Sequence, residues 1–419
     1  MSESSSSSSS LRSSLPWSLL LLLQLALMVP QGSSFTMPQQ PISTGTSGSI
    51  SHRFVLDRSV VMLSAKQRET RGTEAVDFSD MPLLMGQVVN SAYVDDETGE
   101  SSGYLLTELL PVASAKKCQI YQAFRTDTPP EKMSPEHPFF NPLVCKLSAN
   151  LQGMEWESEA YRLLDERLDP VERQAFVEVY DAIPATDRTQ NRAGLIMEKG
   201  LENLRFQIRN KGAYRGETLR QAMQTVIFIV HILHSHGLVW TELKAENFVM
   251  TNTTLNTHTA AAAGKEEEES MFFFGIKGID LESVIPAHDW LRVYTAEACP
   301  PEFPVDELYR SLPRMRVDPS FDMWGLGLVL YEMATGKPFY AAGLTDLEYI
   351  TNQLRYPEAA LKRANAKLLG VPPQPRKLIQ RCMSLDPADR PSCLELLQDP
   401  YFQLGQSILL SKNNKSTTA

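Results

Sequence analysis

The sequence predicts an α+β protein with two lobes: a small N-terminal lobe with a five-stranded, mostly antiparallel sheet and one helix, and a mainly helical C-terminal lobe. Two observations support this fold class. Apolar and polar residues alternate, as in strands, from about residue 100 to 199, whereas apolar residues recur at helical spacing from about 200 to 402. With 42% hydrophobic and 21% charged residues, the chain has the composition of an ordinary globular protein.

Five segments of the first region are predicted to be strands because apolar residues alternate along them. They are 103–113, 116–125, 141–149, 176–183 and 193–200. The small-residue turn "ASAKK" joins the first two. Between the third and fourth, "EWESEAYRLLDERLD" has apolar residues at helical spacing and predicts the single helix of this lobe.

The second region predicts long buried helices. Two of them, 217–237 and 320–336, end in glycine, a good helix stop. Two more are predicted at 375–386 and 393–404, and residues 403–419 form a C-terminal tail. The low-complexity stretch at 251–270 interrupts this pattern and is predicted to be an exposed insertion.

The N-terminus is predicted to be a targeting segment. A serine run precedes "LPWSLLLLLQLALMV", an apolar core of about fifteen residues, which is short of the ~20 that a membrane span needs. Gly32 and Ser34 follow at the spacing that a signal peptidase accepts, so residues 1–34 favour a signal peptide and no stable membrane span in the mature protein. An uncleaved membrane anchor formed by Leu15–Val29 is the alternative.

Residues 35–75 are rich in Ser, Thr and Gln, with several basic residues and few acids, which is typical of a transit peptide or a disordered spacer. A signal peptide followed directly by Phe35 resembles the bipartite plastid-targeting presequence of algae with secondary plastids. This resemblance implies a plastid location. Secretion or the endomembrane lumen is the alternative.

Charge and cysteine content exclude other classes. The formal net charge of -10 argues against a nucleic-acid-binding surface. The five cysteines contain no CxxC pair, so neither a zinc site nor a disulfide framework is indicated, and all five are expected to be reduced and structural.

Several motifs of the N-terminal lobe resemble those of eukaryotic protein kinases, and the resemblance extends over a domain at 85–402. "LVCKL" is similar to the strand whose lysine grips the nucleotide phosphates, which implies that role for Lys146. "ESEAYRLL" resembles the helix that supplies the glutamate partner of this lysine, and Glu159 fits that place best. "LIMEKG" resembles the hinge, with Met197 as gatekeeper and Glu198 and Gly200 lining the adenine slot.

The C-terminal lobe continues the resemblance in the family's order and spacing. "WTELKAEN" is similar to the catalytic loop, with Glu242, Lys244 and Asn247 in register, and "IKGIDLES" resembles the metal-binding turn, with Asp280 as ligand. The resemblance implies ATP and Mg²⁺, with a protein as substrate or regulated partner. "YTAEACPPE" resembles the end of the activation segment, and Thr295 within it favours the Ser/Thr branch.

Three further residues have structural roles in the family. Glu302 and Arg390 would clamp the activation segment to the C-terminal lobe, and Asp322 would hold the backbone of the catalytic loop. Inactive relatives keep these residues too, so they favour the fold but not activity.

Phosphoryl transfer depends mainly on positioning and on neutralising charge on oxygen. The resemblance implies that Lys146 holds the α- and β-phosphates, that Asp280 and Asn247 hold Mg²⁺, and that Lys244 neutralises the γ-phosphate. Glu242 replaces the usual aspartate and would align the substrate hydroxyl. As residue types, glutamate and aspartate have similar acidity, with reference pKa values of about 4.3 and 3.9. The extra methylene of Glu242 matters, however, because a misplacement of about 1 Å can cost about a hundredfold in rate.

Other departures from the family's pattern weaken the expectation of activity. The turn "ASAKK" lacks the glycines that let backbone amides approach phosphates. Trp240 and Thr241 replace a His-Arg pair, so a phosphate on the activation segment loses its usual anchor. Leu281 and Glu282 replace the Phe-Gly that follows the metal-binding aspartate.

Three functions therefore stay open: a Ser/Thr protein kinase of reduced turnover, a pseudokinase scaffold or allosteric partner, and a kinase-like transferase acting on a small molecule or lipid. The segment "VYTAEACPPEF", which resembles a peptide-positioning element, counts against the third. The first two functions differ in one requirement: an active kinase must transfer phosphate in spite of Glu242 and the glycine-free turn, whereas a pseudokinase need not.

Overall fold

The computed structural model describes residues 83–93, 101–110, 118–126, 143–251, 275–306, 314–340 and 347–402. All of them lie in one unit, Arg53–Gln403. The predicted signal peptide, transit-like segment, "ASAKK" turn and C-terminal tail, and all but the first residue of the predicted insertion, lie outside the described residues. Within the described part of the chain, none of the helices has the length and apolar character to cross a membrane.

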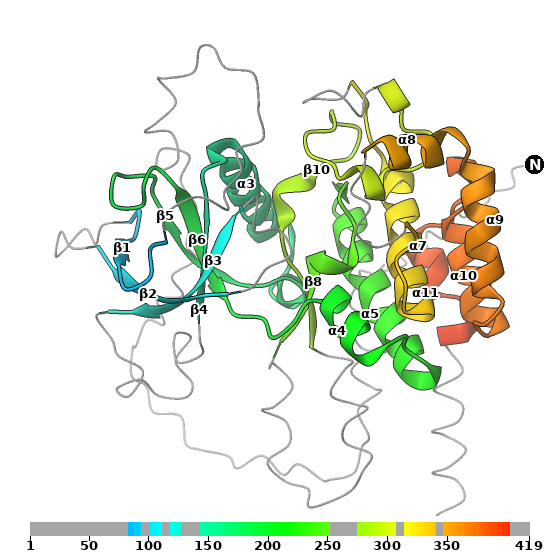
Figure 1. The fold of residues 1–419 in the computed structure, drawn as a ribbon, viewed down its shortest axis with the longest axis horizontal. Helices are drawn as coiled ribbons and strands as arrows, with labels where there is room; N and C mark the ends of the chain where they lie inside the picture. The colour runs from blue at the N-terminus through cyan, green and yellow to red at the C-terminus, as the bar shows by residue number, and fades with distance from the viewer. Residues whose placement is uncertain are drawn as a thin grey trace, which may run out of the picture. The chain divides into compact units, whose positions relative to one another are not determined.

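The sheet of the N-terminal lobe has six described strands in the order β1-β2-β3-β4-β6-β5, and each pair of neighbours is antiparallel (Figure 1). They are β1 (Val88–Asn90), β2 (Gly103–Leu109), β3 (Gln119–Arg125), β4 (Leu143–Ser148), β5 (Val179–Ile183) and β6 (Ala193–Glu198). The five predicted strands are confirmed as β2 to β6. Each described strand is shorter than its sequence segment.

The edge strand β1 is the sixth strand, which the sequence pattern does not predict because three residues are too few to show an alternation. It pairs with β2, with Val89 opposite Tyr104. On either side of it, the backbone N–H of Leu84 donates to the Tyr121 hydroxyl at 3.2 Å, and the Ser91 hydroxyl donates to Asp181 at 2.7 Å. Residues 84–91 are therefore an integral part of this lobe.

The predicted helix of the lobe is confirmed as α3 (Leu151–Arg167), which lies beside the sheet (Figure 1). It begins four residues before the predicted segment because the side chain of Asn150 accepts a hydrogen bond from the N–H of Gly153 at 3.1 Å, as an N-cap residue does. Its buried side chains include Met154, Tyr161 and Leu164, which recur at helical spacing.

The C-terminal lobe is built mainly from helices. Those in the described part are α4 (Leu204–Lys211), α5 (Gly216–Ser235), α7 (Pro319–Thr335), α8 (Leu347–Arg355), α9 (Pro357–Leu368), α10 (Pro373–Cys382) and α11 (Cys393–Leu397). Helix α7 is buried on nearly every side, packing against α5 and α10. The predicted stops are confirmed: Gly237 and Gly336 adopt φ values of 68° and 73°, which favour glycine.

Short ribbons and 3₁₀ helices carry the loops of the site. The ribbons pair β7 (Leu238–Trp240) with β10 (Val284–Pro286) and β8 (Phe248–Met250) with β9 (Ile276–Gly278). The 3₁₀ helices of the described residues are η5 (Glu172–Ala175), η6 (Ala245–Asn247), η8 (Leu281–Ser283), η9 (Ala296–Ala298) and η11 (Pro387–Asp389). All five cysteines of the chain fall within the described ranges, are buried and form no disulfide, as expected.

Candidate active site

The β8–β9 ribbon places Asn247 beside Asp280. Asn247 directly precedes β8, and Asp280 follows the end of β9 by two residues. Because the strands are antiparallel with Phe248 opposite Gly278, these two ends lie together. The N–H of Ile279 also donates to the carbonyl of Asn247 at 2.9 Å. The two predicted magnesium ligands are thus neighbours, although the low-complexity segment separates them in the sequence.

Asp280 is held in an unusual backbone conformation. Its φ of 61° and ψ of 59° lie in the left-handed region, which costs a residue other than glycine roughly 1–3 kcal/mol and is enriched at functional sites. Its Oδ1 lies 2.5 Å from Nζ of Lys146, which comes from β4. This contact joins the two lobes at the candidate site.

Lys146 also pairs with Glu157 of α3, at 2.7 Å between Nζ and Oε2. Burial raises the pKa of Glu157 above its ordinary value, and Lys146 opposes this rise. Burial alone would lower the pKa of Lys146, but the carboxylates of Asp280 and Glu157 hold it well above the ordinary value. Lys146 is therefore a fixed ammonium group between the two lobes.

The prediction that Glu159 is the partner of Lys146 is wrong. The Glu159 carboxylate instead accepts a hydrogen bond from Arg292 of the activation segment at 3.1 Å. Residues two positions apart on a helix point in different directions, so Glu157 and Glu159 cannot both reach β4. Glu159 links α3 to the activation segment and does not support the lysine.

The catalytic loop brings a carboxylate, an ammonium group and an alcohol together. Oε1 of Glu242 accepts hydrogen bonds from Nζ of Lys244 at 2.7 Å and from the hydroxyl of Thr295. Burial would lower the pKa of Lys244, but the Glu242 carboxylate holds it above its ordinary value. Glutamate thus reaches a threonine hydroxyl at this position in spite of its extra methylene.

The backbone of the catalytic loop is held by Asp322 of α7, as predicted. Its Oδ2 accepts hydrogen bonds from the N–H of Trp240 at 2.6 Å and from His234 at 2.9 Å. The Trp240 ring packs against Phe176 and Phe248, with centroids 6.4 and 5.3 Å away. Trp240 is therefore a core aromatic residue that anchors the loop.

The three predicted hinge residues lie at the end of β6 and just beyond it. Met197 is buried, and the Glu198 carboxylate accepts a hydrogen bond from Lys277 of β9 at 2.7 Å. A Cβ on Gly200 would lie 2.1 Å from Cγ2 of Val249, so the hinge backbone approaches β8 more closely than any other residue type allows. Only glycine therefore fits at position 200, where the hinge backbone packs against Val249 of β8.

The activation segment is fixed at both ends. Glu302 and Arg390 form the predicted clamp, with two hydrogen bonds of 2.6 Å each. Near the other end, the Glu282 carboxylate lies over Gly153 in the first turn of α3, where a Cβ would come within 2.9 Å of Oε2. A negative charge is favourable at the start of a helix, which gives Glu282 a role in this chain.

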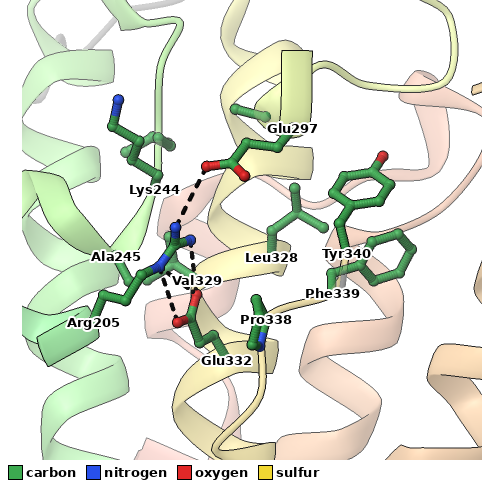
Figure 2. A pocket seen from close by; sticks show the side chains of 12 residues that line it. Arg205, Lys244, Ala245, Glu297, Leu328, Val329, Glu332, Pro338, Phe339 and Tyr340 are labelled. Atoms are coloured by element: carbon green, nitrogen blue, oxygen red, sulfur yellow. Dashed lines mark hydrogen bonds and ion pairs between the residues drawn. The ribbon is translucent and has the colours of Figure 1, made fainter. Parts of the chain in front are cut away.

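A pocket beside Lys244 contains a charge network that the sequence does not reveal. Figure 2 shows the Arg205 guanidinium between Glu297 and Glu332. It lies 3.4 Å from Glu297 and 3.0 Å from Glu332, and it also pairs with Glu246. Burial would lower the pKa of Arg205, but these carboxylates raise it. The network ties α4, the catalytic loop, the activation segment and α7 together.

The donor groups of the site fit a nucleotide with magnesium. Lys146 supplies a fixed positive charge, and Asp280 supplies a carboxylate. Asn247 uses its amide nitrogen to bond the Glu242 carbonyl at 2.9 Å, so its amide oxygen is the atom suited to a hard cation. The described residues contain no group of three or more His, Cys, Asp or Glu able to hold a metal. Proteins usually hold Mg²⁺ through one or two side chains together with substrate phosphates, which fits Asp280 and Asn247.

A family model described as "Protein kinase domain" matches residues 168–402, more than half of the chain. The match begins after α3, so it includes Glu242, Lys244, Asn247 and Asp280 but not Lys146. A solved structure of a kinase domain covers 71% of this chain with 95% of its own length, at a TM-score of 0.50 and 17% identity. At this identity the likeness shows the fold alone.

Similar proteins include the dual specificity protein kinase Ttk of Danio rerio, 25% identical over 252 residues, or 59% of this chain and 23% of that protein. The serine/threonine-protein kinase pim-2 of Danio rerio is 27% identical over 196 residues, or 46% of this chain and 51% of that protein. The chain thus spans about half or less of the length of these relatives.

Proposed function

The chain belongs to the protein kinase domain family, and from this premise we propose that it transfers the γ-phosphate of Mg-ATP to Ser or Thr hydroxyls of a protein substrate. Glu242 takes the place of the catalytic aspartate in this proposal. The names of the similar kinases, which include a serine/threonine kinase and a dual specificity kinase, support the substrate class.

The observation that carries the proposal is that two carboxylates and an asparagine gather around Lys146. Its ammonium group lies 2.7 Å from Glu157 and 2.5 Å from Asp280, while Asn247 adjoins Asp280 through the β8–β9 ribbon. Asp280 is held in a left-handed conformation beside this lysine, and a conformation of this kind at an active site supports a functional role.

Each residue has a defined task in the transfer. Lys146 neutralises charge on the α- and β-phosphates, and Asp280 and Asn247 would hold Mg²⁺, which would supply further positive charge to the phosphate oxygens. Glu242 aligns the substrate hydroxyl and accepts its proton as the new P–O bond forms and the bond to ADP breaks. Lys244, 2.7 Å from Glu242, neutralises the transferred group.

A pseudokinase that binds nucleotide and acts as a scaffold or allosteric partner is the second candidate. One observation favours it: the Glu242 side chain is fully buried, and its Oε1 is already engaged by Lys244 and Thr295. A substrate hydroxyl would have to displace or share these contacts.

The test uses the purified full chain with Mg-ATP labelled at the γ-phosphate and a generic protein substrate. Transfer that is lost in Asp280→Asn supports the kinase. A rise in melting temperature with Mg-ATP but no transfer above the Asp280→Asn background supports the pseudokinase. A melting temperature unmoved by millimolar Mg-ATP contradicts both, because saturation at about 100 times the dissociation constant should add about 2.7 kcal/mol.

We propose further that the mature protein acts in a plastid, on the basis of the presequence at 1–75. The mature chain would then begin at Phe35 or downstream. N-terminal sequencing of the protein from its native cell tests this, and retention of Leu15–Val29 would instead support a membrane anchor.

A further inference from the structure

The hydroxyl of Thr241 joins the catalytic loop to the activation segment. Thr241 lies between Trp240 and Glu242 and is only 1% exposed. Its single hydroxyl proton is shared between the backbone carbonyls of Val293, at 2.8 Å, and Ser283, at the longer distance of 3.2 Å. One buried side chain therefore contacts two distant points of the same segment.

These two points flank the reacting groups. Ser283 ends η8, three residues after Asp280, and Val293 lies two residues before Thr295. Thr241 itself is the residue before Glu242. The single hydroxyl thus lies between the predicted metal ligand, the acid and the threonine that bonds the acid.

The stretch that Thr241 holds has little regular structure of its own. Residues 292–294 lie in no helix or strand, so no ladder of backbone hydrogen bonds sets their position. A side-chain hydrogen bond to a carbonyl can fix such a stretch, and here the Thr241 hydroxyl bonds the Val293 carbonyl at a partly buried position.

We propose that Thr241 is a positioning residue for the phosphoryl transfer, because its hydroxyl sets the placement of Glu242 against Thr295. This inference rests on the proposed kinase function. It assigns Thr241 no contact with the substrate and no part in proton transfer.

The test compares Thr241→Val, which keeps the shape and removes the hydroxyl, with Thr241→Ser, which keeps the hydroxyl. Thr225→Val is the matched control, because the Thr225 hydroxyl bonds the Gln221 carbonyl within α5. We expect kcat of Thr241→Val to fall about 10- to 100-fold with the KM for ATP unchanged, as for a misplaced catalytic group. Thr241→Ser should retain most of the activity.

Amide hydrogen exchange of residues 293–298 gives a second measurement that does not need activity. One lost hydrogen bond should speed exchange about fivefold in Thr241→Val and leave Thr241→Ser and Thr225→Val near wild type. The proposal is overturned by full activity in Thr241→Val, by a serine variant as impaired as the valine variant, or by a parallel rise in the KM for ATP. If wild type shows no transfer, the kinase proposal fails. If amide exchange is equal in wild type and all variants, the Thr241 hydroxyl does not hold the activation segment, and the positioning role is overturned.

Discussion

Nζ of Lys146 lies 2.7 Å from Oε2 of Glu157, whose side chain is fully buried, whereas Glu159 pairs with Arg292 at a partly exposed position. Glu157→Gln removes the charge that holds Lys146 in place, so we expect kcat/KM for ATP to fall about 100-fold. Glu159→Gln is the matched control and should change it less than about twofold, because exposed ion pairs contribute little. Initial rates at varied ATP concentrations measure kcat/KM for both variants. A larger loss in Glu159→Gln than in Glu157→Gln would show that Glu159 is the partner of Lys146.

Glu242 provides the second prediction. Glu242→Gln keeps the size of the side chain and removes the acceptor charge, so turnover should fall about 10²-fold or more. Glu242→Asp shortens the reach to Lys244 and Thr295, so turnover should fall about tenfold. The rise in melting temperature that Mg-ATP causes should be the same in wild type and in both variants. Equal background transfer by wild type and both variants, with Mg-ATP still bound, would rule out catalysis.

Gly200 and Val249 provide a packing prediction. A Cβ at Gly200 would lie 2.1 Å from Val249, so Gly200→Ala should lower the free energy of unfolding by about 1–3 kcal/mol and raise the KM for ATP. Adding Val249→Ala should recover part of both losses. Gly370→Ala is the control, because its nearest neighbouring atom is 3.7 Å away. Urea unfolding measures the effect, and a double variant no better than Gly200→Ala would argue against this contact.

Asp181 should make stability depend on pH. Burial raises its pKa, although the hydroxyls of Ser91 and Tyr104 oppose the rise. The native state then binds more protons than the unfolded state above about pH 3.9, so this residue's contribution to stability falls as pH rises through its folded pKa. The free energy of unfolding of wild type relative to Asp181→Asn should therefore decrease as pH rises above about 3.9 and level off once the pH exceeds the folded pKa of Asp181. A difference that grows with pH would show that the hydroxyls outweigh burial.

The sequence predicts the strands and the long helices because their side-chain patterns repeat over many residues. It also contains the signal for Glu157, which lies three residues after Met154 and four before Tyr161 on the buried face of α3. Glu159 is not on that face, so helical spacing alone is enough to identify Glu157 as the buried glutamate.

Other features have no local signal. Arg205 meets Glu246, Glu297 and Glu332 only after four separate elements pack together. The hydroxyl contacts of Thr241 likewise depend on how the activation segment folds back over the catalytic loop. Spacing along the chain cannot show such contacts because they join residues tens of positions apart.

The edge strand β1 has a consequence for where the proposed presequence could be cleaved. It covers the outer edge of β2, and an uncovered strand edge can template pairing with another chain. Cleavage beyond residue 93 would remove β1 together with Leu84 and Ser91 and would leave that edge open to aggregation. The position of the proposed processing site would therefore bear on the solubility of the protein.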